Sequence, residues 1–185
     1  MIAFVTTNEG KFREVSAMLA EAGVKLVRED RSYPEIQADR LEKVVRFAAT
    51  VLDDQIRGDY LIDDSGFFLD HFGGFPGVFS SYAYKRLGCA GLLKLLDGVR
   101  NRGAMFETVF LYRHGGTHEV FHGECRGLVA DRERGAAGFG FDPIFLPEGA
   151  TKTFAEMTLT EKNAVSHRSR AVAALLAYLR SETEP

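Results

Sequence analysis

The sequence predicts an α/β fold built around a mixed β-sheet. Short apolar stretches alternate along the chain with segments whose apolar residues recur at helical spacing. Two longer stretches on either side of Gly115-Gly116 have the pattern of an antiparallel hairpin. Strands that alternate with helices favour parallel pairing, and an added hairpin makes the sheet mixed. With 185 residues, of which 45% are hydrophobic, the chain fits one domain, residues 1–185, with a proper core.

The first half of the chain predicts three strands and two helices. Residues 2–6 are a short apolar run, and apolar side chains then recur at helical spacing over residues 11–21 as far as Gly23, a helix stop. A second strand over 25–28 leads through a polar loop to a helix that begins near Arg40 and carries its apolar residues on one side. Residues 60–63 form the next strand, which we expect to end at the following polar residues.

The second half predicts the hairpin between two helices. Residues 91–96 are rich in leucine and indicate a short helix. Residues 104–113 and 119–130 are the two hairpin strands, and a last helix is expected over residues 161–180. We find no internal repeat, low-complexity tract or linker between domains.

Composition excludes several classes of protein. The 23 basic and 26 acidic residues are mixed along the chain and give a net charge of -3, so no basic face is offered to nucleic acid or to a membrane. Residues 1–6 lack the features of a signal peptide, and no stretch reaches the roughly 20 apolar residues that cross a bilayer. Cys89 and Cys125 stand far apart without a Cys-x-x-Cys motif, which is typical of reduced, buried thiols. We therefore expect a cytoplasmic protein.

The most informative stretch is the run Asp63, Asp64, Ser65 and Gly66 after an apolar strand. Two adjacent carboxylates and a hydroxyl bring hard oxygen ligands to one point, and the glycine leaves the backbone free to approach a substrate. This arrangement favours a magnesium site at a strand end. The alternative is an ordinary turn, because Asp, Ser and Gly are also the commonest turn formers.

A second polar cluster lies between the first strand and the first helix and consists of Thr6, Thr7, Asn8, Glu9, Gly10 and Lys11. Short polar side chains, a glycine and the free N–H groups of a helix start bind phosphate oxygens, and Lys11 adds positive charge. The alternative is that Asn8 only caps the helix. Glu35, in the polar loop before the second helix, is of a type that usually lies on the surface, and only a partner ligand would make it a metal-binding residue.

Two further clusters lie in the second half. Glycines alternate with aromatic residues in Phe139-Gly140-Phe141-Asp142, which allows a flat ring to approach the backbone and stack on a phenyl face. The alternative is that these phenylalanines belong to the core. Residues 161–170 open the last expected helix with Lys162, Ser166 and then Ser169 or Arg170 near one face, and a solvated helix start is the ordinary explanation for them.

The segment His118-Glu119-Val120-Phe121-His122 matches the His-Glu-x-x-His motif of zinc peptidases. That motif binds zinc only on a helix, where residues four apart lie together. Here the segment lies between glycines and contains β-branched and aromatic residues, so it reads as a strand, on which the two imidazoles would be roughly 13 Å apart. A zinc site is therefore disfavoured.

The clusters, taken together and in this order, resemble the inosine/xanthosine triphosphate pyrophosphatase family. The matching segments cover nearly the whole chain and are residues 6–11, 34–37, 63–66, 73–77, 139–143, 153–157 and 161–168. The loop Pro34-Glu35-Ile36-Gln37 is more similar to the archaeal and eukaryotic branch than to the usual bacterial one.

The resemblance implies a two-lobed α/β domain, usually a homodimer, with the nucleotide in a cleft between the lobes. It implies hydrolysis of ITP, dITP or XTP to the monophosphate and pyrophosphate with Mg²⁺ as cofactor. Glu35 and Asp64 would hold the metal, Asp64 would accept the proton of the attacking water, and Lys11 would act with it in catalysis. The residues implied to bind substrate are Thr6, Thr7, Asn8, Glu9, Gly10, Lys11, Ser65, Phe139, Gly140, Phe141, Asp142, Lys162, His167 and Arg168, with Arg46 as a weaker candidate.

Base recognition follows from chemistry. Hypoxanthine and xanthine present an O6 acceptor where adenine presents an amino donor, so donors from Arg168 or Lys162 favour the deaminated bases. The family usually has Tyr or Trp where this chain has Phe141, which keeps stacking but has no hydrogen bond to offer. Two other functions remain open, a nucleotide-binding regulator without turnover and a zinc hydrolase that uses His118 and His122.

Overall fold

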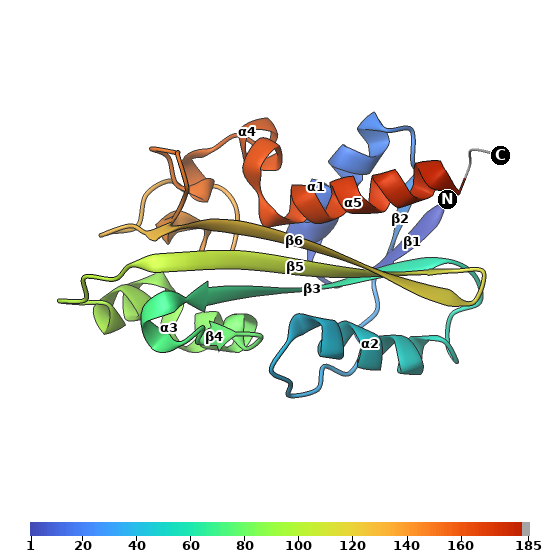
Figure 1. Ribbon diagram of the computed structural model, residues 1–185, viewed down its shortest axis with the longest axis horizontal. Helices are drawn as coiled ribbons and strands as arrows, with labels where there is room; N and C mark the ends of the chain where they lie inside the picture. The colour runs from blue at the N-terminus through green and yellow to red at the C-terminus, as the bar shows by residue number, and fades with distance from the viewer. Residues whose placement is uncertain (183–185) are drawn as a thin grey trace. The chain divides into compact units, whose positions relative to one another are not determined.

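The computed structural model describes residues 1–182, so the last three residues of the expected 1–185 domain lie outside the described part. Its seven-stranded sheet has the hydrogen-bonded order β2-β1-β3-β5-β6-β7, with β4 paired to β3 (Figure 1). The strands are β1 (Ile2–Val5), β2 (Leu26–Glu29), β3 (Tyr60–Leu69), β4 (Pro76–Gly77), β5 (Gly103–His114), β6 (Thr117–Val129) and β7 (Phe145–Pro147). The α-helices are α1 (Glu9–Glu21), α2 (Leu41–Leu52), α3 (Ser80–Leu95), α4 (Leu159–Val165) and α5 (His167–Ser181). Three short 3₁₀ helices are η1 (Asp70–Phe72), η2 (Asp142–Ile144) and η3 (Phe154–Glu156).

Strand directions confirm the mixed α/β sheet. Strand β1 is parallel to both β2 and β3, whereas β4 is antiparallel to β3 and β7 is antiparallel to β6. In the β1–β3 ladder, Phe4 pairs with Leu61, so the carboxyl ends of both strands reach the same edge. The polar residues that follow β1 therefore lie near the acidic residues of β3.

The chain forms two compact units. Unit 1 comprises Met1–Asp64, Thr108–Gly123 and the segment from Arg168, and unit 2 comprises Ser65–Glu107 and Glu124–His167. The chain thus passes from one unit to the other between Asp64 and Ser65 and again between His167 and Arg168. Strands β3, β5 and β6 contribute residues to both units.

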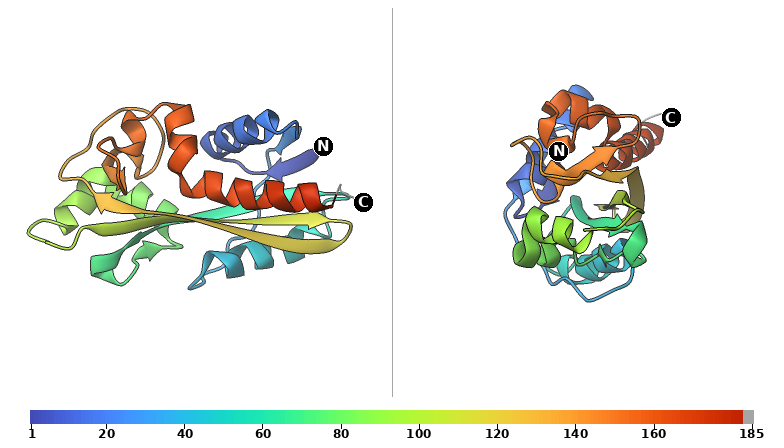
Figure 2. Two further views of the ribbon diagram at one scale, coloured as in Figure 1. Left: turned by 45° about the horizontal axis from the view of Figure 1, so that its top comes forward. Right: turned by 90° about the vertical axis from the view of Figure 1, so that its left-hand side faces the viewer.

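Unit 1 is layered, with α1 and α5 on one face of its strands and α2 on the other (Figures 1 and 2). The α1–α5 side buries an apolar cluster that includes Phe4, Leu19, Phe110 and Leu175. Helix α2 is amphipathic, and its buried residues recur at helical spacing, as the sequence predicts: Leu41, Val44, Val45, Ala48, Ala49 and Leu52.

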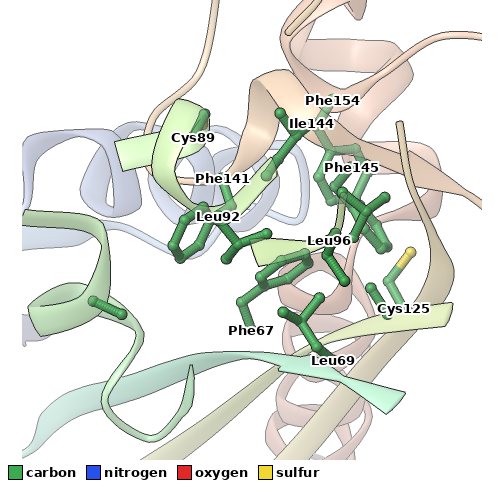
Figure 3. Close-up of a cluster of buried hydrophobic side chains, with 13 residues drawn as sticks. Phe67, Leu69, Cys89, Leu92, Leu96, Cys125, Phe141, Ile144, Phe145 and Phe154 are labelled. Carbon is green, nitrogen blue, oxygen red and sulfur yellow. The ribbon is translucent and has the colours of Figure 1, made fainter. Parts of the chain in front are cut away.

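Unit 2 has its own core, which is rich in phenylalanine (Figure 3). The Phe67 ring lies 5.1 Å from that of Phe141 and 5.8 Å from that of Phe145, and the Phe145 ring lies 5.0 Å from that of Phe154. Because Phe141 is only 2% exposed in this cluster, its ring belongs to the core. It therefore cannot form the open base-stacking surface that the sequence suggested as one possibility for this residue.

The bounds of β3 and α3 differ from the sequence prediction by several residues. Strand β3 continues to Leu69 instead of ending at Asp63, because Phe67 and Phe68 pair with Gly77 and Pro76 of β4. A helix already begins at Ser80, well before the predicted residue 91, and has a break in helical geometry at Gly88 (φ 62°).

The last predicted helix, over residues 161–180, is in fact two helices. Ser166 has φ -72° and ψ 157°, an extended conformation that separates α4 from α5. Lys162 and Ser166 therefore do not share a face of one continuous helix, as the sequence prediction assumed.

The hairpin prediction is confirmed. Gly115 and Gly116 have φ angles of 57° and 88°, as a tight turn between antiparallel strands requires. His118 and His122 lie within strand β6, so the His-Glu-x-x-His segment is not helical. Among residues 1–182, no helix has the length and apolar character needed to cross a bilayer. Both cysteines are free and buried.

Candidate active site

The polar segment after β1 forms the capped start of α1. The Asn8 side chain accepts a hydrogen bond from the Lys11 amide at 3.0 Å, and the Asn8 amide donates to Thr6 Oγ1 at 3.1 Å. Asn8 is thus the N-cap that the sequence offered as an alternative role. Within residues 1–182 the amides of Glu9 and Gly10 have no acceptor, so this helix start still presents two N–H groups to an anion.

Arg28 of β2 fixes the backbone of the same segment. Its guanidinium donates to the carbonyl oxygen of Thr6 at 3.3 Å and to that of Thr7 at 3.2 Å. Both carbonyls therefore face Arg28, which keeps their partial negative charges bound to a cation.

Lys11 pairs with a carboxylate of β3. Its Nζ lies 3.0 Å from Asp63 Oδ2, and the Asp63 side chain is 1% exposed. The parallel β1–β3 pairing explains this contact, because it brings the residues that follow β1 to the level of Asp63. The contact holds the Lys11 ammonium group close to the helix start that presents its amides.

The charges of three carboxylates act on the Tyr33 hydroxyl. Tyr33 Oη donates to the Asp63 carbonyl oxygen at 3.1 Å. Burial, followed by the charges of Asp63, Asp64 and Glu35, raises the pKa of Tyr33 well above its ordinary value. Glu35 and Asp64 therefore lie near the same phenol, although they are far apart in the sequence.

The donor set suits a hard divalent cation. Glu35 is exposed and Asp64 is partly exposed, so both can offer carboxylate oxygens to solvent. In the described residues no three His, Cys, Asp or Glu side chains are arranged to hold a metal ion by themselves. Mg²⁺ is usually bound by only one or two protein carboxylates together with substrate phosphates and water, so a pair of carboxylates fits such a site.

Asp64, Ser65 and Gly66 lie inside strand β3, where the sequence predicted a strand end. Successive side chains of a strand point to opposite faces, so Asp63 and Asp64 face different sides of the sheet. A Cβ atom at Gly66 would lie 2.8 Å from the Gly77 carbonyl oxygen and 2.6 Å from the Phe68 ring. Glycine at position 66 thus allows close packing against β4, which the sequence analysis had not foreseen.

In unit 2, Asp142 links the Phe139 turn to α4. Asp142 Oδ2 accepts from the Phe139 amide at 2.9 Å and from Lys162 Nζ at 2.6 Å, and both charged side chains are buried. Lys162 Nζ also lies 5.0 Å from the centre of the Phe139 ring and 5.1 Å from that of Phe154. A Cβ atom at Gly138 would overlap the Asp142 carboxylate, so this position requires glycine.

His167 lies at the start of α5 against the same aromatic group. Its ring stacks on Phe106 at 4.8 Å with an interplanar angle of 12° and lies 6.2 Å from the Phe154 ring. Lys162 Nζ lies 5.1 Å from the centre of the same Phe154 ring, so both polar side chains are neighbours of Phe154. His167 is only 2% exposed, so the stacking holds its imidazole in one orientation.

Arg168, the next residue, forms a buried ion pair in unit 1. Its guanidinium contacts the Glu14 carboxylate of α1, and the two side chains are 2% and 3% exposed. The pair fixes the direction of the arginine. Any base-recognition role for Arg168 therefore depends on Glu14, a residue that the sequence analysis did not select.

Other predicted residues stand apart from these contacts. Arg46 is exposed on α2 and pairs with Glu42 at 2.6 Å, which lowers the pKa of that carboxyl. His118 and His122 likewise pair with carboxylates of unit 1, at 3.0 Å from Asp53 and 3.5 Å from Glu42.

Three contacts of the predicted residues escaped the sequence analysis: those made by Tyr33 and Glu14 in unit 1 and by Phe106 in unit 2. A phenylalanine and a tyrosine carry no local signal that separates a site residue from a core residue. Glu14 did carry one, because it lies in the predicted helix next to Val15 of the apolar face, where an unpaired carboxylate would be costly.

Comparison with known proteins gives one consistent family. Residues 2–178 match the model of the Ham1 family. The chain is 49% identical over 171 residues to a dITP/XTP pyrophosphatase of Thermococcus kodakarensis, covering 92% of each chain. It is 45% identical over 179 residues to a dITP/XTP pyrophosphatase of Pyrococcus horikoshii, covering 97% of this chain and 96% of that one. The solved structure of the Staphylococcus aureus Ham1 protein matches with a TM-score of 0.84 at 26% identity, over 99% of this chain and 100% of that one.

Proposed function

The chain belongs to the Ham1 family, and on that premise we propose that it hydrolyses ITP, dITP and XTP to the nucleoside monophosphate and pyrophosphate. The names of the two archaeal relatives support the substrate class, and they agree with the branch expected from the Pro34–Gln37 loop. The observation in this chain that carries the proposal is the contact of Lys11 with Asp63 beside the open amides of α1. This contact places a cation next to the hydrogen-bond donors of a helix start, and a bound polyphosphate is stabilised by both.

In the proposed reaction, the unit 1 residues position the triphosphate and the attacking water. The amides of Glu9 and Gly10, the side chains of Thr6 and Thr7 and the charge of Lys11 bind phosphate oxygens. Phosphoryl transfer depends mostly on such positioning and charge neutralisation. Asp64 accepts a proton from water as the water oxygen forms a bond to the α-phosphorus, and the anhydride bond between the α- and β-phosphates breaks to release pyrophosphate.

Glu35 and Asp64 are proposed to hold Mg²⁺, supported by their common proximity to Tyr33. When bound, Mg²⁺ would neutralise charge on the phosphate oxygens and on the leaving pyrophosphate. Ser65 follows Asp64 directly in β3 and is proposed to contact the substrate beside it.

Lys162 and His167 of unit 2 and Arg168 of unit 1 are proposed to bind the nucleoside. Lys162, oriented by Asp142 and the Phe139 ring, is a donor for the O6 acceptor of hypoxanthine and xanthine, and Arg168 is a second donor held by Glu14. Adenine presents its own donor at that position, so these side chains disfavour it. His167 is held by the Phe106 ring and is proposed to contact the nucleotide as well.

Two further properties belong to the proposal. We propose a homodimer, supported by large apolar side chains of unit 2 that remain exposed in the single chain, namely Phe75, Phe79, Tyr82 and Leu87. We also propose a cytoplasmic location, supported by the two free buried thiols. Light scattering on the purified protein measures the proposed dimeric state directly.

Comparing catalytic efficiency for ITP, XTP and dITP with that for ATP and GTP, under Mg²⁺, tests the proposed substrate class. The proposal predicts that the three deaminated nucleotides are strongly preferred. Equal efficiency for ATP and ITP would refute it. Binding of ITP without any turnover would instead favour the regulator, and activity that requires zinc would favour the hydrolase based on His118 and His122.

A further inference from the structure

The segment between β2 and α2, residues 30–40, contains no helix or strand and is largely exposed, yet it carries Glu35. An ion pair holds each end of this segment. Asp30 pairs with Arg28 of β2, and Asp39 pairs with Lys43 of α2. Between them, within the described part of the chain, one hydrogen bond joins residues 32–38 to the sheet, from Tyr33 Oη to the Asp63 carbonyl oxygen at 3.1 Å.

The geometry makes Tyr33 an effective anchor for Glu35. Pro34, the only residue between them, has a fixed φ angle and restricts the residue before it to extended conformations. The position of Glu35 is therefore coupled to that of Tyr33 through a short, stiff connection. The acceptor carbonyl belongs to Asp63, the immediate neighbour of Asp64 in β3.

We infer that Tyr33 is a positioning residue for the proposed reaction, because its hydrogen bond to Asp63 holds the 30–40 loop so that the Glu35 carboxylate stays beside Asp64. The inference rests on the proposed function only for the statement that these two carboxylates bind the metal. The Tyr33 hydroxyl is used as a donor to the Asp63 carbonyl oxygen, so its role is to orient Glu35 and not to bind the metal.

The test compares Tyr33→Phe, which removes only the hydroxyl, with Tyr178→Phe as the matched control. Within residues 1–182 the Tyr178 hydroxyl makes no hydrogen bond, and the residue lies in the same unit on α5. The first measurement is the rate at which a glutamate-specific protease cuts after Glu35 in folded, metal-free protein. Tyr33→Phe is expected to raise that rate about 2- to 10-fold, the net effect of one lost hydrogen bond, and Tyr178→Phe to leave it unchanged.

The second measurement is the binding of Mn²⁺, used in place of Mg²⁺, followed by electron paramagnetic resonance in the presence of nucleoside monophosphate. Tyr33→Phe is expected to weaken binding about 2- to 10-fold, and a high concentration of Mg²⁺ is expected to restore its turnover. Unchanged cleavage after Glu35 would overturn the anchor. Faster cleavage with unchanged Mn²⁺ binding would refute the claim that the Tyr33 hydrogen bond positions Glu35 for metal binding.

The two measurements distinguish a wrong positioning role for Tyr33 from a wrong proposed function. Protease cleavage is measured without metal or nucleotide, so it reports the Tyr33 anchor whatever reaction the protein performs. If wild-type protein released no pyrophosphate from ITP while both measurements changed as expected, the proposed reaction would be wrong and the positioning role of Tyr33 would stand.

Discussion

Replacing Glu14 with glutamine removes the negative partner of Arg168 while keeping the size of the side chain. Both side chains are almost fully buried, at 3% and 2% exposure, so the guanidinium loses the charge of Glu14 away from water. Breaking a buried ion pair in this way costs about 3–5 kcal/mol. In a chain of this length 1 kcal/mol corresponds to about 2–4 °C, so the melting temperature should fall by about 6–20 °C.

Thermal unfolding followed by circular dichroism, without nucleotide, measures this change. Asp39→Asn is the matched control, because it makes the same acid-to-amide change in the exposed Lys43–Asp39 pair, whose side chains are 51% and 69% exposed. Its melting temperature should stay within about 1 °C of wild type, since exposed pairs contribute little. A Glu14→Gln protein that melts within about 2 °C of wild type would show that the Arg168 charge is not buried as the structure describes, and the reasoning would fail.

The remaining predictions concern the two ends of the substrate, the metal and a helix cap. Lys162→Ala should shrink the ratio of ITP to ATP catalytic efficiency about 5- to 150-fold, because each polar pair to a base edge carries roughly 1–3 kcal/mol of discrimination, whereas Lys11→Ala should lower both efficiencies and leave their ratio nearly intact. The ratio does not depend on the fraction of folded enzyme, so loss of stability cannot mimic this result, and the opposite pattern would reverse the two assignments. EDTA should abolish turnover and Mg²⁺ should restore it, whereas restoration by zinc alone would contradict the carboxylate site. The hydrogen bond from Lys152, with the Thr158 capping bonds, lowers the pKa of Glu161 from 4.5 to about 2, so its contribution to stability is present above pH 4.5 and is lost as the pH falls towards 2. Glu161→Gln should therefore melt below wild type at pH 7 and together with it near pH 2, and an equal deficit at both pH values would exclude this ionisation as the cause.

Local sequence patterns predicted the elements whose stabilising contacts are also local. Asn8 followed by Lys11 signals a helix start, and the observed cap uses these two residues. Helix α2 and the hairpin at Gly115-Gly116 were likewise predicted, because apolar periodicity and a two-glycine turn are sufficient for them.

The differences arise where distant segments decide the structure. Asp64, Ser65 and Gly66 have turn propensity, but pairing of Phe67 with Gly77 continues the strand through them. No pattern near residue 64 reveals that pairing. The break between α4 and α5 had a partial local signal, since Thr158 and Glu161 form a capping box that marks an earlier helix start, and the extended Ser166 then ends that short helix.

The site was predicted as a set of residue types but not as a set of contacts. The sequence indicated Lys11, Asp64 and Lys162, yet the partners that orient them or lie beside them, such as Asp142 for Lys162 and Tyr33 near Asp64, depend on which strands and loops meet in the fold. Their roles in catalysis and binding stay predictions.

The most direct test of the central claim is to quantify dIMP, pyrophosphate and orthophosphate released from dITP by the wild-type protein and by Asp64→Asn, side by side with Mg²⁺. This substitution removes the proposed proton acceptor and a metal ligand while barely changing the size of the side chain. We predict that wild-type protein forms dIMP and pyrophosphate in equal amounts, without orthophosphate, and that Asp64→Asn is about 100-fold slower or more. Release of orthophosphate from dITP, or turnover by Asp64→Asn at the wild-type rate, would contradict the account.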